Sequence, residues 1–172
     1  APANTASGLA KLGISTSFIG KVGDDPFGYF LKQELDKNKV DTSSLILSSE
    51  YRTTLAFVSQ KQDGGRDFYF FKGAHDKLAP EEVSLPKETS IFHFGSLSQT
   101  SPNSRKATQK LMKQARDQGA MISYDPNLRK NLWEDLNEAK QIMLSTSKEV
   151  DIFKMSEEET VFLAGTKDPK KA

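Results

Sequence analysis

The chain has 172 residues, with 24 lysine and arginine residues against 23 aspartate and glutamate residues, and 36% of its residues are hydrophobic. This size and composition predict one globular domain with a sizeable core, and the balanced charge argues against a nucleic acid or an anionic membrane as partner. The absence of cysteine excludes disulfide bonds, thiolate nucleophiles and cysteine metal sites, and it fits a cytoplasmic protein.

The first forty residues predict a helix, a strand and a second helix. Small residues around Leu9 end at Gly13, which is typical of a short and closely packed helix. The run 17–22 predicts a buried strand. An acidic pair followed by Pro26 indicates the start of the next helix, which we expect to bury one apolar face formed by Phe27, Phe30, Leu31 and Leu35.

The middle of the chain changes to a β period. The runs 53–59 and 66–71 are rich in β-forming residues, and Asp63-Gly64-Gly65 between them supplies a turn that tolerates positive φ. This pattern predicts a β-hairpin. Together with 44–47 it is expected to form a small antiparallel sheet, an insertion at about 44–72.

Strands then alternate with helices to the end of the chain. The strands are expected at 91–94, 121–124 and 151–154, with helices after Ser101 and around Ala139, and a last helix between Ser156 and Gly165. This order predicts an α/β fold with a mostly parallel sheet covered on both faces.

Polar residues follow the expected strands, at the edge where open parallel sheets bind ligands. They are Asp24 and Asp25, the run 95–98, the run Asp125-Pro126-Asn127-Leu128-Arg129, and Ser156 with the acidic residues 157–159. Hydroxyl acceptors, a guanidinium and carboxylates suit a polyol and a metal-bound polyphosphate.

Two familiar phosphate motifs are absent. Gly20-Lys21-Val22-Gly23 is not a dinucleotide fingerprint, and the glycines at 23 and 28 have P-loop spacing but Tyr29 and Phe30 stand where Lys and Ser or Thr are required. His75 and His93 are too few and too scattered for a metal site. We expect His93 to be a core histidine.

These residues carry a resemblance to the PfkB, or ribokinase-like, carbohydrate kinases. The segment 4–23 resembles the first signature of that family, and Asp125-Pro126-Asn127-Leu128-Arg129 resembles a segment of its fructokinase and ketodeoxygluconate kinase branch. The runs 92–98 and 154–159 are also similar to fructokinase segments. The resemblance covers the chain to about Gly165 and implies a three-layer sandwich with a β lid, here as one incomplete kinase domain over residues 1–172.

The resemblance implies a sugar-binding site formed by the first residues of the chain and the lid. Asn4 would bind sugar hydroxyls, and the small residue Ala1 would let the ligand approach the backbone. The lid would provide walls from Phe57, Tyr69 and Phe71, with Lys72 where relatives often carry Arg.

The resemblance also implies a nucleotide site for ATP and Mg²⁺. Arg129 would stabilise phosphate or substrate, Asp125 and Asn127 would lie near the cofactor, and Ser156 and Glu159 would occupy the family's Asn-x-x-Glu positions. Glu159 would act on Mg²⁺ through water. Ser156 departs from the asparagine of that motif, so its role is the less certain of the two.

Each of these residues also has a simpler structural explanation. Asn4 could be a helix N-cap, the Asp-Pro-Asn run a turn between strand and helix, and residues 157–159 a solvated first helical turn. The aromatic run 68–71 could serve hydrophobic packing alone.

The resemblance leaves more than one function open. Fructose is the expected sugar and 2-keto-3-deoxygluconate the alternative; a non-catalytic kinase-like module or assembly factor is a third reading. The expected partners are the sugar and ATP, with a homodimer formed through the lid. The chain starts without Met and ends in a charged run, so we expect both ends to be cut.

Family members carry a Gly-Ala-Gly-Asp motif whose Asp is the general base and whose helix N-terminus holds phosphate, as well as an earlier sugar-binding Asp. Neither is present among these 172 residues. We therefore predict that the 172 residues alone transfer no phosphate measurably. Sugar-dependent ADP release above that of a mock preparation would contradict this prediction.

Overall fold

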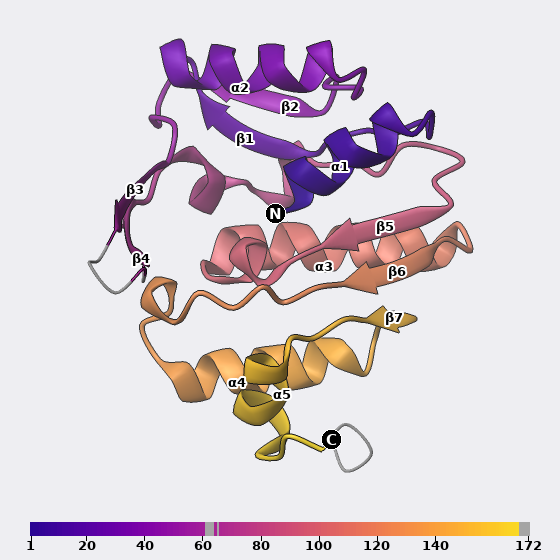
Figure 1. Ribbon diagram of the computed structural model, residues 1–172. Helices are drawn as coiled ribbons and strands as arrows, with labels where there is room; N and C mark the ends of the chain where they lie inside the picture. Colours follow the sequence, from indigo (N-terminus) through magenta and orange to yellow (C-terminus); the bar gives the residue numbers. More distant parts are fainter. Residues whose placement is uncertain (61–63, 65, 169–172) are drawn as a thin grey trace. The chain divides into compact units, whose positions relative to one another are not determined.

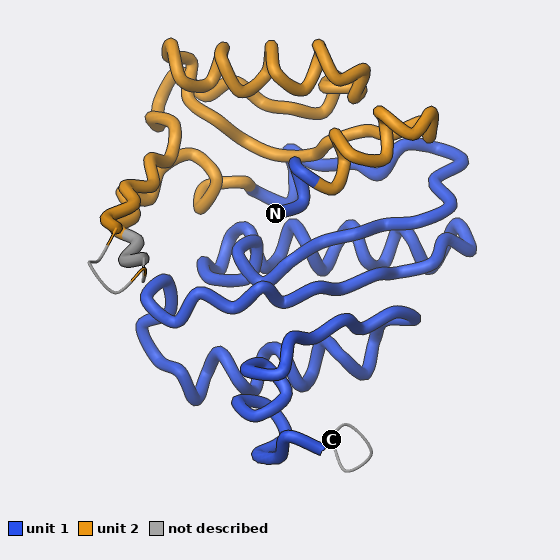
Figure 2. The backbone as a smooth tube through the Cα atoms, viewed as in Figure 1, with its two compact units in different colours: residues 1–4, 79–172 blue, residues 5–78 orange. Residues whose placement is uncertain are grey.

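The computed structural model describes residues 1–60, 64 and 66–168, which form two compact units (Figures 1 and 2). Unit 1 comprises residues 1–4 and 79–172, and unit 2 comprises residues 5–78. Within the described residues, none of the helices has the length and apolar character that a membrane span requires.

Unit 1 contains a three-stranded parallel sheet in the order β5-β6-β7. Its elements alternate along the chain, as the sequence predicts: β5 (Ile91–Phe94), α3 (Pro102–Asp117), β6 (Met121–Tyr124), α4 (Leu136–Ser147), β7 (Ile152–Phe153) and α5 (Glu157–Ala164). Short 3₁₀ turns lie at η2 (Pro80–Glu82), η3 (Ser96–Gln99) and η4 (Lys130–Leu132). Strands β5 and β6 have the predicted bounds, whereas β7 is shorter.

An aromatic stack crosses this sheet on one face. The ring centroids of Phe92 and Phe94 lie 5.4 Å apart, those of Phe94 and Tyr124 4.8 Å, and those of Tyr124 and Phe153 5.5 Å. These residues share one face because successive side chains of a strand point to opposite faces. The stack packs towards α3, which contacts β5 and β6.

The tyrosine hydroxyl of this stack is buried and fully paired. Tyr124 donates to Gln99 Oε1 at 2.7 Å, and Gln99 Nε2 donates to Thr146 Oγ1 at 2.9 Å. Burial raises the pKa of Tyr124, so the phenol stays protonated. The chain of hydrogen bonds links the end of β6 to η3 and α4.

The opposite face of the sheet is more open. Ile91, Met121 and Ile152 are exposed there, and His93 accepts or donates a hydrogen bond with Ser123 Oγ at 3.0 Å on the neighbouring strand. His93 is thus hydrogen-bonded, but it is half-buried on this face and does not belong to the core, so the expectation of a core histidine is wrong. Helices covering both faces of the sheet were expected, but within the described part of unit 1 this face keeps three large apolar side chains in solvent.

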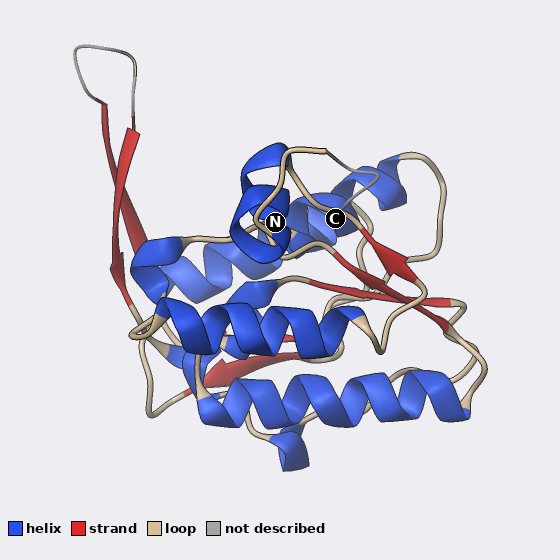
Figure 3. Cartoon of the chain, turned by 90° about the horizontal axis from the view of Figure 1, so that it is seen from below, coloured by secondary structure: helices blue, strands red, loops and turns tan. Residues whose placement is uncertain are grey.

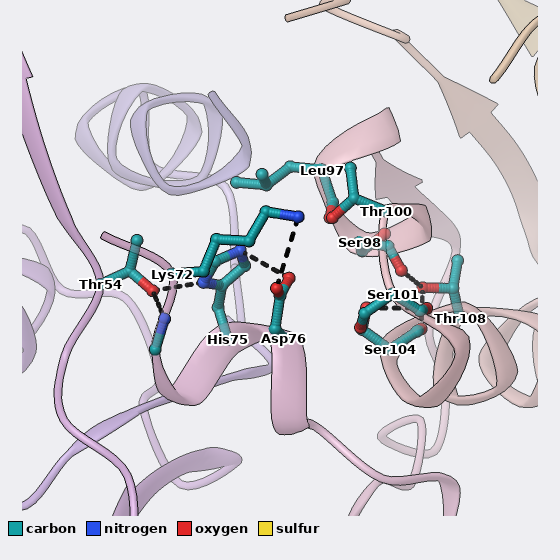
Figure 4. Close-up of polar contacts among 11 residues, drawn as sticks. Thr54, Lys72, His75, Asp76, Leu97, Ser98, Thr100, Ser101, Ser104 and Thr108 are labelled. Carbon is teal, nitrogen blue, oxygen red and sulfur yellow. Dashed lines mark hydrogen bonds and ion pairs between the residues drawn. The ribbon is translucent and has the colours of Figure 1, made fainter. Parts of the chain in front are cut away.

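Helix ends in unit 1 follow the sequence signals closely. Ser156 caps α5 in a capping box with Glu159, and Gly165 ends it in the left-handed region at φ 72°. At the start of α3, Ser101 pairs its hydroxyl with that of Ser104 at 2.7 Å instead of capping an amide (Figure 4).

Unit 2 contains two separate two-stranded sheets. Helix α1 (Pro2–Lys11), whose first residues belong to unit 1, precedes β1 (Gly20–Gly23), α2 (Pro26–Lys37), β2 (Leu45–Ser48), β3 (Leu55–Gln60), β4 (Arg66–Phe71) and the 3₁₀ turn η1 (Ala74–Lys77). The pair β1-β2 is parallel and the pair β3-β4 is antiparallel.

The hairpin is confirmed, but its sheet is smaller than expected. Strand β2 pairs with β1 instead of with the hairpin, so the expected antiparallel sheet including residues 44–47 is wrong. Figure 3 shows β3 and β4 as a ribbon of two strands. Gly64 has φ 81°, as a turn requires, whereas Asp63 and Gly65 lie outside the described residues.

Helix α2 turns a different face inwards from the one that its sequence indicates. Gly28 and Leu35 are buried, while Phe27 is 56% and Phe30 57% exposed. A Cβ atom added to Gly28 would lie 1.9 Å from Gly23 O, so the helix approaches β1 through the glycine. The expected apolar face is therefore wrong for Phe27, Phe30 and Leu31.

The carboxylate of Asp25 joins α2 to the root of the hairpin. It caps the helix by accepting from Gly28 N at 2.9 Å, and it accepts from Thr53 N and Thr53 Oγ1, both at 2.8 Å. Thr53 Oγ1 in turn accepts from Gly23 N at 2.9 Å. Burial acts to raise the pKa of Asp25, but the hydrogen bonds from Thr53 and Gly28 outweigh it, and the pKa is lowered.

A second group of contacts ties the two arms of the hairpin together (Figure 4). Thr54 Oγ1 accepts from Gly73 N at 2.9 Å and contacts His75 Nδ1. Ala74 N donates to Arg52 O at 2.8 Å. These hydrogen bonds thus hold together the two segments from which the hairpin extends.

We predict that Asp25→Asn lowers the free energy of unfolding by about 1–3 kcal/mol, because the charged acceptor is lost while buried donors remain. Denaturant unfolding with exposed Asp24→Asn as the matched control, expected to change little, measures this.

The stability difference between the wild type and Asp25→Asn depends on pH with a defined sign. The folded pKa of Asp25 lies below 3.8, so its stabilisation is present above that pH and is lost as the pH falls through the folded value. The difference between wild type and Asp25→Asn should shrink below this pH, and a difference that grows there would contradict the assignment.

Candidate functional site

The carboxyl ends of the three strands in unit 1 lie side by side, as the sequence predicts. Asp125 N donates to Phe94 O at 3.1 Å, and Lys154 N donates to Tyr124 O at 3.0 Å. A hollow of about 410 Å³ lies at this edge. It is lined by Asn127, Leu128, Arg129, Lys130, Lys154, Ser156, Glu158 and Glu159.

The segment after β6 is held in an irregular but defined conformation. Ser96 N donates to Pro126 O at 3.0 Å, and a Cβ on Gly95 would lie 2.9 Å from Asp125 O, so glycine permits this approach. Asn127 has φ 44°, in the left-handed region that asparagine tolerates better than most residues. This segment is therefore more than a turn between a strand and a helix, because it also forms one wall of the hollow.

Arg129 brings a permanent positive charge to that wall. Its Nη1 donates to the carbonyl oxygens of Leu128 at 3.1 Å and Asn127 at 3.4 Å. Lys130 and Lys154 add two cations to the lining. These three cations outnumber the two carboxylates of the lining, Glu158 and Glu159, and a net positive hollow suits an anionic ligand such as a phosphate group.

Glu159 also lines the hollow and is only 6% exposed. Its Oε1 accepts from Leu128 N at 2.6 Å, and its Oε2 accepts from Ser156 N at 2.8 Å. Burial acts to raise the pKa of Glu159, but the backbone hydrogen bonds from Ser156 and Leu128 outweigh it and lower the pKa. The carboxylate is thus ionised at neutral pH and bound to two segments of backbone.

Asp125 stands beside the hollow with one oxygen paired. Its Oδ2 lies 3.1 Å from Lys154 Nζ, while its buried Oδ1 has no hydrogen-bond partner in the described structure. The amino group of Ala1 is close enough to be affected: burial lowers its pKa, Arg129 lowers it further and Asp125 opposes the shift. An unpaired buried acceptor is the kind of atom that a ligand hydroxyl satisfies.

The structure thus gathers Asn127, Arg129, Ser156 and Glu159 in one hollow, with Asp125 and Ala1 near it. Asn4 does not line it. Asn4 is exposed in the first turn of α1, inside the helix, so the N-cap explanation is wrong.

The predicted lid residues belong to unit 2 and form an aromatic surface of their own. Phe57 and Tyr69 are cross-strand partners. The Phe57 and Phe71 rings meet edge to face at 5.6 Å, and those of Tyr69 and Phe71 at 5.0 Å. All three are exposed. Lys72 lies 3.7 Å from Asp76 Oδ2, an ion pair drawn in Figure 4.

Sequence reasoning missed three contributors to the hollow: the Leu128 amide, Lys130 and Lys154. The strand-end rule that selected residues 125–129 applies equally to Lys154, which follows β7. No sequence signal indicated that a backbone amide would be bound by Glu159. In the part of the chain that the structure describes, no three His, Cys, Asp or Glu residues group so as to hold a metal ion.

Comparison with known proteins identifies the class of protein that this fold and site define. The sequence matches the pfkB family carbohydrate kinases over residues 1–172, and the chain belongs to this family. It is 42% identical over 169 residues to fructokinase-1 of Oryza sativa, which covers 96% of this chain and 52% of that protein. The chain thus spans about half the length of the curated relatives it matches.

Solved structures agree with this assignment. The fructokinase from Vibrio cholerae O395 bound to fructose, ADP and calcium superposes with a TM-score of 0.88 at 30% identity, over 98% of this chain and 56% of that one. A sugar kinase from Pyrococcus horikoshii in complex with ATP gives a TM-score of 0.89 at 33% identity, over 95% of this chain and 55% of that one. The predicted family and its ribokinase-like α/β fold are confirmed.

A matched pair of variants tests the conformation of the segment in the hollow. Asn127→Gly keeps the positive φ without strain, whereas Asn127→Ala places a Cβ in the left-handed region, which costs about 1–2 kcal/mol. We predict that the alanine variant is the less stable of the two in denaturant unfolding. Equal stabilities would show that residue 127 does not adopt φ 44° in solution.

Proposed function

We propose that this chain provides part of an ATP-dependent sugar kinase that phosphorylates a hydroxyl group of a ketose, with fructose as the substrate. The hollow with Arg129 at the ends of parallel strands is the observation that carries the proposal. Family membership supplies the reaction class, and relatives named as fructokinases support the sugar.

The residues of the hollow suit the charge that moves in phosphoryl transfer. Such reactions depend on positioning and on neutralising the oxygens of the transferred group. Arg129 would face a phosphate and be supported by Lys130 and Lys154, while Asn127 and the unpaired Oδ1 of Asp125 would accept or donate hydrogen bonds to ligand hydroxyls. Asn4 and Ala1 remain proposed sugar contacts.

Mg²⁺ would enter with the nucleotide. This ion prefers few protein carboxylates and keeps several waters and phosphate oxygens as ligands. That preference fits a described structure without a cluster of three acidic or histidine ligands. The ion would supply charge neutralisation on the phosphates, and the proton of the attacking hydroxyl would pass to a base outside these 172 residues.

The exposed aromatic surface of the hairpin suits two related tasks. Phe57, Tyr69 and Phe71 would cover the apolar face of a sugar, and the same hairpin would be the contact between two subunits. We propose both, because exposed apolar surfaces of this kind usually mark interaction sites.

Lys72 leaves a second substrate open. It lies at the base of the hairpin and pairs with Asp76 at 3.7 Å, and a sugar acid such as 2-keto-3-deoxygluconate would have to take the place of Asp76 to pair its carboxylate with Lys72.

Steady-state kinetics of the protein as its gene encodes it distinguish these functions. We expect a higher kcat/KM for fructose than for 2-keto-3-deoxygluconate, and the reverse order would reject the first choice. Activity with neither substrate would favour the non-catalytic reading.

A second kinetic prediction concerns Arg129. Arg129→Ala should lower kcat/KM by roughly 10²–10³, as is typical when one charged donor to a transition state is removed. Arg116→Ala is the matched control: Arg116 on α3 pairs with Glu149, just after α4, at 3.5 Å, and its replacement is expected to have no kinetic effect. If both variants have the same kcat/KM, Arg129 does not belong to the site.

A further inference from the structure

The side chain of Glu159 connects two segments that are distant in the sequence. One oxygen binds the amide of Leu128 on the wall of the hollow, and the other binds the amide of Ser156 at the start of α5. Ser156 Oγ in turn accepts a hydrogen bond from Glu159 N at 3.3 Å. A local capping box therefore has a long-range extension, because an ordinary box involves only its own helix.

The amide of Leu128 has few other means of being paired. It lies between Asn127, which has a positive φ, and Arg129, and it belongs to no helix or strand. Leu128 is half-buried, and an amide shielded from water without an acceptor is costly. The position of the Leu128 amide, and with it the side chains on either side, is thus fixed by the Glu159 carboxylate.

The same geometry leaves Glu159 little freedom to bind the hydration shell of a metal ion. Its two oxygens accept hydrogen bonds of 2.6 and 2.8 Å from backbone amides, which use two of the about four lone-pair sites of a carboxylate. The side chain is held in place by these amides and is only 6% exposed, so its described contacts serve the backbone. The expected action of Glu159 on Mg²⁺ through water does not fit these contacts.

We propose that Glu159 is a positioning residue, which holds the Leu128 amide and thereby sets the places of Asn127 and Arg129 in the hollow. Its contribution to catalysis then passes through the 127–129 segment instead of through a metal ion. The kinetic part of this inference rests on the proposed kinase function, whereas the structural part does not.

The structural part is tested by amide hydrogen exchange in the protein as its gene encodes it. The Leu128 amide should be protected although it lies in an irregular segment. In Glu159→Gln, whose side chain has only one acceptor oxygen, exchange of the Leu128 or Ser156 amide should become roughly tenfold faster or more.

Glu157→Gln is the matched control on the same helical turn. Glu157 is exposed and pairs with Lys167 at 3.2 Å, so its replacement should leave the exchange of both amides unchanged. A Leu128 amide that exchanges as fast as an exposed loop amide in the wild type would overturn the proposal, even if Glu159→Gln failed to fold.

The kinetic part is tested by a double-mutant cycle with Arg129→Ala. If Glu159 acts through the 127–129 segment, Glu159→Gln should lower kcat/KM in the wild type but add little once Arg129 is removed, because the two effects are then coupled. Raising the Mg²⁺ concentration should not restore activity.

The opposite pattern would overturn the proposal. An undiminished effect of Glu159→Gln in the Arg129→Ala background, with recovery at high Mg²⁺, would assign Glu159 to the metal. A wild-type protein without kinase activity would reject the proposed function, and the exchange measurements would still decide whether Glu159 holds the Leu128 amide.

Discussion

The aromatic stack across β5, β6 and β7 is the contact on which the candidate site depends. Four rings with centroid separations of 4.8 to 5.5 Å hold three parallel strands in register. The hydroxyl of Tyr124 is paired inside the protein, so the stack can be buried without an unsatisfied polar group. The strands then end together, and the segments that follow them meet around one hollow.

The sequence predicts most of the elements because local signals and burial agree. Alternating residues place β5 and β6 at the expected positions, and Ser156 and Gly165 mark the ends of the last helix. The buried face of α2 is not predictable in this way. Hydrophobic spacing favours Phe27 and Phe30, but the approach of Gly28 to a carbonyl of β1 decides the orientation, and a glycine has no weight in an apolar pattern.

The site is predictable as a set of neighbouring segments, but its internal contacts are not. Residues 125–129 and 156–159 follow strands of one sheet, which is sufficient to bring them together. The hydrogen bond from Leu128 to Glu159 and the ion pair of Asp125 with Lys154 join residues 31 and 29 positions apart. No local spacing encodes such pairs, and a backbone amide has no sequence signature at all.

The hairpin of unit 2 depends on contacts at its base. A ribbon of only two strands has marginal stability of its own, and here Asp25, Thr53 and Thr54 fasten it at its base. The hairpin residues far from this base contribute little to the stability of the sheets, so mutations there cost little free energy of folding. Residues of such a ribbon can therefore change at little cost to stability, whereas the parallel strands around the hollow tolerate fewer changes.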